Sequence, residues 1–89
     1  MSNMEWLQSL ISAGKALKIT PEMSPSDVHL TGVRGGSFLS ILIDSYPEHA
    51  DFSAGDFYIY YDIGMMSGSA GFIIMKDDIV VKHIVIIMS

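Results

Sequence analysis

The sequence contains no cysteine among its 89 residues. Its absence excludes a disulfide framework, a thiolate nucleophile and a cysteine-ligated zinc site. Basic residues are also scarce: Lys and Arg together number 5 against 10 Asp and Glu, so the formal net charge is −5 and the pI is near 4.8. Nucleic acids and anionic membranes are bound through clustered Lys and Arg, so this balance disfavours direct contact with either.

Long hydrophobic runs are missing as well. The longest stretch without a charged residue or histidine, residues 63–75, is shorter than the run of about 18 apolar residues that a membrane-spanning helix needs. A secretion signal would place basic residues before its apolar segment, whereas here Glu5 comes first and Lys15 and Lys18 follow. We therefore expect a cytoplasmic protein without a membrane segment.

What the chain does contain is apolar side chains. Hydrophobic residues make up 49% and charged residues 17%, which is typical of a folded chain, and the length fits a single domain over residues 1–89. The mean hydropathy of +0.39 is high for a soluble monomer. We therefore expect more apolar surface than a soluble monomer usually exposes, and this surface must be covered by other parts of the chain or by a partner.

The first segment, about 3–18, is predicted to be a helix. Ser2 and Glu5 have the spacing of a capping box, in which each side chain satisfies a free backbone N–H at the start of a helix. Apolar residues and one glycine then follow at helical spacing: Trp6, Leu7, Leu10, Ile11, Gly14 and Leu17. Thr20-Pro21 and Ser24-Pro25 break this pattern and predict a loop over 19–27.

Residues 28–88 are predicted to be rich in strands. Alternation around 28–32 and 37–44, with glycines between, favours a hairpin. The alternative for residues 37–45 is a short helix that Ser37 caps and Pro47 ends, since the same apolar residues also fit a period of 3.6. Residues 45–55 are predicted to be a loop.

Three further strands are expected at 56–63, 70–75 and 79–88, with turns at 64–68 and 76–78. The last strand is apolar on both faces, which is typical of a central strand covered on both sides. The expected fold is therefore α+β, with one N-terminal helix packed on a four- to five-stranded antiparallel sheet. Irregular segments, a second copy or a partner would cover the second face.

Charge is segregated along the chain. No Lys or Arg lies between Gly35 and Met75, and five acids do: Asp44, Glu48, Asp51, Asp56 and Asp62. They are either ordinary solvated loop residues or a docking surface that steers a basic partner. Tyr58 and Tyr60 share a strand face with Asp62, and Met65 and Met66 follow. These apolar side chains either anchor a partner or, in the case of the tyrosines, pack under the helix.

Motifs for catalysis or metal binding are weak. Glu48-His49-Ala50-Asp51 offers two good ligands where a metal site needs three or four. The glycine-rich 32–36 lacks the Gly-Lys-Ser/Thr ending of a phosphate loop, and the serines at 67–69 do not fit a nucleophile elbow. We therefore expect no enzyme, no catalytic residue, no cofactor and no metal.

The sequence favours a small acidic, non-catalytic binding module that acts by protein–protein contact. The most specific expectation is a stoichiometric inhibitor, of the immunity or anti-defence type, that covers a basic or nucleic-acid-binding partner. The contact residues would be the five acids, the two tyrosines and the two methionines. The alternatives are a homodimeric structural or assembly protein and, third, a small-molecule-binding domain with Arg34 or His83 as its polar anchor.

Overall fold

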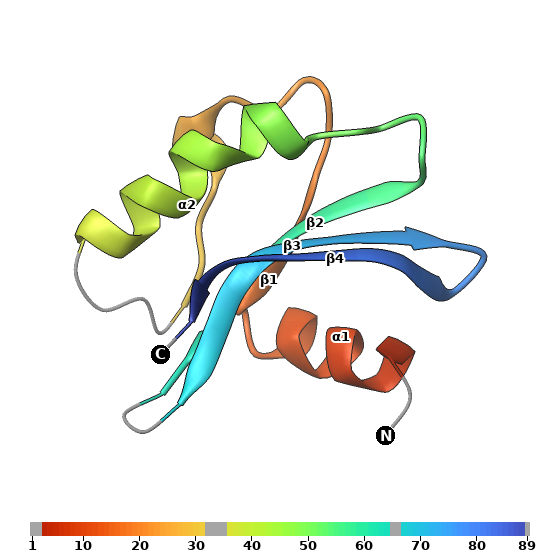
Figure 1. The fold of residues 1–89 in the computed structure, drawn as a ribbon, viewed down its shortest axis with the longest axis horizontal. Coiled ribbons are helices and arrows are strands. Elements are labelled where there is room, and N and C mark those ends of the chain that lie inside the picture. The colour runs from red at the N-terminus through yellow and green to blue at the C-terminus, as the bar shows by residue number, and fades with distance from the viewer. Residues whose placement is uncertain (1–2, 32–35, 65–66, 89) are drawn as a thin grey trace.

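The computed structural model describes residues 3–31, 36–64 and 67–88 (Figure 1). Its elements in chain order are α1 (Asn3–Ser12), β1 (Ala16–Ile19), the short 3-10 helix η1 (Pro25–Asp27), α2 (Gly36–His49), β2 (Asp56–Ile63), β3 (Gly68–Lys76) and β4 (Ile79–Met88). The four strands form one antiparallel sheet in the order β1-β2-β3-β4. This confirms the predicted α+β fold with an N-terminal helix on an antiparallel sheet, and adds a second helix.

The helix α1 is shorter than predicted because Gly14 ends it. Gly14 has φ of +75°, the left-handed conformation that glycine adopts without strain. Its N–H donates to the carbonyl of Ile11 at 3.0 Å, and that of Lys15 donates to the carbonyl of Leu10 at 2.8 Å. These bonds form a Schellman motif. The prediction of helix through residue 18 was therefore wrong, and residues 16–19 instead form β1 beside β2.

The predicted hairpin of 28–32 and 37–44 was also wrong, because residues 36–49 form α2. The alternative of a helix over 37–45 is correct, and it extends into the predicted loop 45–55. Leu42 and Tyr46, one turn apart, are buried, while Ile41 is 49% exposed. That pattern has helical period. Pro47 lies in the last turn, inside the helix it was expected to end.

The two helices cover opposite faces of the sheet (Figure 1). Alternate residues of β2 and β3 divide into two cores, as the pleat requires. The core under α2 includes Leu42, Phe57, Ile59, Phe72 and Ile74. The core under α1 joins Leu7 and Leu10 to Ala16, Tyr60, Ile73 and Met75. The second face of the sheet is therefore covered by α2.

The three C-terminal strands were predicted correctly, but not the position of the last. β4 is an edge strand, although it is apolar on both faces. The turn before it contains Asp77 and Asp78, with φ of 53° and 63°. Positive φ at both central residues is the type I′ turn that matches strand twist, and Asp tolerates this conformation better than most residues.

Candidate functional site

The expected contact residues do not form one surface. Asp44 and Glu48 are exposed on α2, and Asp51 follows that helix. The other expected residues within the described ranges, Asp56, Tyr58, Tyr60 and Asp62, alternate along β2 toward α1, on the opposite face. Met65 and Met66 lie outside the described residues.

The two tyrosines pack under the helix, as the alternative interpretation held. Tyr60 is buried and belongs to the core under α1. The ring of Trp6 meets the ring of Tyr60 edge to face, with centroids 5.4 Å apart. Tyr58 is half-buried at the border of the same core. The ring of Tyr60 therefore stabilises the domain, and only Tyr58 keeps surface for a ligand.

Two of the five acids have lysine partners, one in β1 and one just before it. Nζ of Lys15 lies 3.3 Å from Oδ1 of Asp62, and Nζ of Lys18 lies 3.3 Å from Oδ1 of Asp56. These exposed pairs contribute at most about 1 kcal/mol each. They show that the acidic stretch of sequence receives its compensating charge from a distant segment.

Asp51 has a local structural role. Its carboxylate accepts a hydrogen bond from the Ser53 hydroxyl at 2.6 Å. That bond is the main reason why the pKa of Asp51 is lowered. Bonds from a carboxylate to nearby groups of its own loop are usual for Asp in turns.

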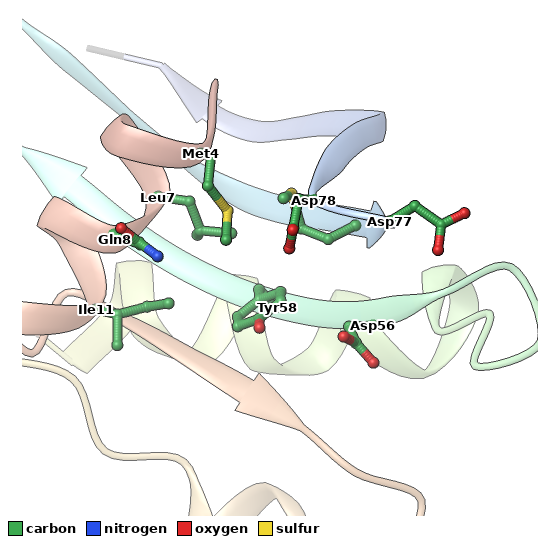
Figure 2. A pocket seen from close by; sticks show the side chains of 9 residues that line it. Met4, Leu7, Gln8, Ile11, Asp56, Tyr58, Asp77 and Asp78 are labelled. Carbon is green, nitrogen blue, oxygen red and sulfur yellow. The ribbon is translucent and has the colours of Figure 1, made fainter. Parts of the chain in front are cut away.

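A pocket of about 210 Å³ lies between α1 and one end of the sheet (Figure 2). Its apolar lining comes from α1 and from the facing strands: Met4, Leu7, Ile11, Tyr58 and Met75. Its polar lining is Gln8 together with three carboxylates, Asp56, Asp77 and Asp78. The pocket is thus an apolar hollow with an acidic rim.

Folding brings the three acids of the rim to the same end of the sheet. Asp56 begins β2, and its register partner Met75 stands two residues before the turn that holds Asp77 and Asp78. Met75 faces α1, so the adjacent Lys76 points to the opposite face of the sheet. The rim therefore keeps a negative charge, although Asp56 is paired with Lys18.

Sequence reasoning found Asp56 and Tyr58 of this pocket but missed the rest. Asp77 and Asp78 were interpreted as turn residues, which they are. The sequence signal that could have indicated a site here is the pair of adjacent acids in a tight turn. One acid or an Asn-Gly pair would be enough to form such a turn.

A second hollow, of about 320 Å³, lies beside β1 and is more open. Lys18 and Glu22 both line it, so its rim has no single sign of charge. Phe52, which is 38% exposed, and Phe57 supply its aromatic lining. It offers less selectivity for a charged ligand than the pocket under α1.

A separate polar cluster lies on the α1 face of the sheet, around Tyr60. The Tyr60 hydroxyl is 2.6 Å from Nε2 of His83 and 2.9 Å from Oγ of Ser69. Burial raises the pKa of Tyr60, with a smaller contribution from the charge of Asp62, and burial lowers the pKa of His83. The phenol therefore stays protonated and the imidazole neutral at pH 7, and the tautomer of the imidazole sets the direction of the hydrogen bond between them.

No side chain of this cluster is an activated nucleophile. A phenol with a raised pKa stays un-ionised at pH 7 and is therefore no nucleophile, and the Ser69 hydroxyl contacts the phenol rather than the imidazole. The ring of His49 packs 5.5 Å from that of Phe72. Within residues 3–31, 36–64 and 67–88, no three His, Asp or Glu side chains are grouped to bind a metal.

Comparison with known proteins found no match among family models, curated proteins or solved structures. Among the described residues, no helix is both long and apolar enough to cross a membrane. Function must therefore be inferred from the chemistry of the pocket and the surfaces around it.

Proposed function

We propose that this protein is a non-catalytic binding module for a protein with a basic surface, and that the pocket between α1 and the β3–β4 turn receives a Lys or Arg side chain of that partner. The observation that supports this most directly is the composition of the pocket, with carboxylates at its rim and apolar side chains below them.

Size and polarity favour a single side chain as the occupant. Pockets for drug-sized ligands span about 300–1,000 Å³, so a pocket of about 210 Å³ is small. Lys and Arg combine an apolar stem with a cationic end, and they bury the stem while the charge stays near water. Met4, Leu7 and Ile11 would contact the stem, and Asp77 and Asp78 would face the charge.

The remaining exposed acids have a longer-range role in this proposal. Asp44 and Glu48 project from α2, and the whole chain carries a net charge of −5. Such a field raises the rate of encounter with a basic surface more than it raises the final affinity. A module that occupies a basic surface also competes with nucleic acid for it, which would make it a stoichiometric inhibitor.

Binding of a tetra-arginine peptide, followed by calorimetry at low salt, tests this proposal. We expect binding that weakens as salt is added, and no binding of the tetra-citrulline peptide, which has nearly the same shape but no charge. The double variant Asp77→Asn/Asp78→Asn keeps side chains that tolerate positive φ and removes both charges. It should weaken binding by about fivefold to thirtyfold, because two exposed ion pairs together contribute about 1–2 kcal/mol.

The matched control is Asp44→Asn/Glu48→Gln, which removes the same charge from α2. It should reduce binding less than the turn variant does. If both variants lose binding equally, binding depends on the net charge of the protein and not on the pocket. Equal binding of the tetra-arginine and tetra-citrulline peptides would contradict a role for charge.

A further inference from the structure

The outer edge of β4 is a second exposed feature, separate from the pocket. β4 spans Ile79–Met88 and pairs with β3 along one side. Four of its apolar residues are largely exposed: Ile79 at 62%, Val81 at 52%, Val85 at 41% and Met88 at 77%. A sheet edge presents unpaired backbone N–H and C=O groups, and an apolar edge of this length attracts another strand.

The edge is only partly protected against such pairing. Lys82 is its one charged residue, and its register with β3 shifts near both ends, between Ala70 and Gly71 and between Ile74 and Met75. Between these shifts, Lys82–Val85 pairs regularly with β3. This regular stretch is the part of the edge that another strand can join without distortion.

The opposite edge of the sheet cannot serve as the partner strand. β1 has four residues, and Pro21 follows shortly after it. Thr31 returns to the start of this strand, where its N–H donates to the carbonyl of Gly14 at 2.8 Å and its hydroxyl donates to that of Ala13 at 2.7 Å. Joining β4 of one copy to β1 of the next would give an open filament. The short β1 disfavours that arrangement.

We propose that two copies of this chain pair antiparallel through β4, forming one continuous eight-stranded sheet with a two-fold axis. The second copy suits the edge because eight of the ten residues of β4 are apolar, so most side chains of one β4 would lie beside apolar side chains of the other.

Charge favours the antiparallel arrangement in particular. Asp77 and Asp78 stand just before β4. Antiparallel pairing places them beside the end of the other copy's β4, about 34 Å from the equivalent acids, given about 3.4 Å per residue over the ten residues of the strand. At that distance the repulsion between them is screened at physiological salt. The residues of α1 that line the pocket lie outside β4, so the dimer is inferred independently of the proposed basic partner.

The test is sedimentation equilibrium of the full chain over micromolar to millimolar concentrations. The wild type should reach twice its chain mass of 9.8 kDa. The double variant Val81→Lys/Val85→Lys should sediment at half the wild-type mass with an unchanged circular dichroism spectrum. Ile84 and Ile86 are less suitable for substitution because they pack against the core under α2.

Ile41→Lys is the matched control, because Ile41 is 49% exposed and belongs to α2 and not to β4. It should leave the dimer intact. A wild type that stays monomeric at all concentrations would overturn the proposal, as would a dimer that survives Val81→Lys/Val85→Lys or one that Ile41→Lys also dissociates.

Hydrogen exchange of the wild type keeps the proposal testable if the double variant does not fold. Dilution should dissociate the dimer and so reduce the protection of β4 amides from exchange, while the protection of β2 amides stays unchanged. Protection of β4 that does not depend on concentration would contradict pairing between copies.

Discussion

The hydroxyl of Tyr60 lies 2.6 Å from Nε2 of His83, so β2 is joined to β4 across the strand between them. The residue of β3 that faces Tyr60 in the register is Gly71. A Cβ at Gly71 would collide with the backbone of Ile84, so the glycine lets β4 pass close to β3 at this point. The Tyr60–His83 bond connects the core under α1 to the edge that we propose as the dimer interface.

Removing the Tyr60 hydroxyl should therefore destabilise the domain. We expect Tyr60→Phe to lower the free energy of unfolding by about 1 kcal/mol, the usual net contribution of a hydrogen bond. Urea unfolding measures the difference. Tyr58→Phe, on the same face of β2, removes a hydroxyl that bonds to no other described residue and should change little. Equal effects of the two variants would contradict the role of the Tyr60–His83 bond.

Stability should decrease as the solution is acidified past the histidine range. Burial lowers the pKa of His83 below its ordinary value of 6.5, so the unfolded chain takes up a proton before the folded one does. The contribution of His83 to the free energy of unfolding is therefore complete above pH 6.5. It is lost as the pH falls from there through the pKa that His83 has in the folded chain.

Thermal unfolding at about pH 7.5 and about pH 5 measures this loss, and His83→Gln is the control. The variant keeps a polar side chain and removes the titrating ring, so its loss between the two pH values should be smaller. An unchanged loss would assign the pH dependence to other groups.

Gly14 should not tolerate a side chain. Its φ of +75° strains any other L-residue, and a Cβ there would collide with the Thr31 hydroxyl. We expect Gly14→Ala to lower the free energy of unfolding by about 1–3 kcal/mol in urea unfolding. Gly64→Ala is the comparison, because a Cβ at Gly64 makes ordinary contact. A harmless Gly14→Ala would contradict the helix end at this residue.

Neighbouring residues of α2 should differ sharply in their sensitivity to truncation. Leu42 is completely buried and Ile41 is 49% exposed. Leu42→Ala should cost about 2–5 kcal/mol, and Ile41→Ala should cost far less. Comparable losses would mean that both side chains are buried, which is the pattern of a strand covered on both faces and not of this helix.

The sequence predicts the C-terminal strands well because both the period and the turn are local signals. Residues 56–63 alternate cleanly, and Asp77-Asp78 suits the tight turn before β4. Residues 37–44 fit periods of two and of 3.6 almost equally, so only packing on the sheet decides for α2. The strand β1 was hidden because Leu17 continues the helical spacing, and Gly14 ends the helix before that residue.

The position of β4 and the pocket could not be predicted for a different reason. A strand that is apolar on both faces is typical of a sheet centre, and β4 has that pattern at an edge. The pocket joins residues from α1, β2 and the β3–β4 turn, which no local pattern brings together. The acids that seemed most distinctive, between Gly35 and Met75, instead divide between two faces, and two of them pair with lysines of β1 or beside it.

Nuclear magnetic resonance of the ¹⁵N-labelled chain, titrated with the tetra-arginine peptide, tests the central claim most directly. The account predicts that the amide signals that shift most belong to residues around the pocket, such as Gln8, Tyr58 and Asp78, and that Asp77→Asn/Asp78→Asn reduces those shifts. Shifts centred on Asp44 and Glu48 of α2, with the pocket unaffected, would contradict it.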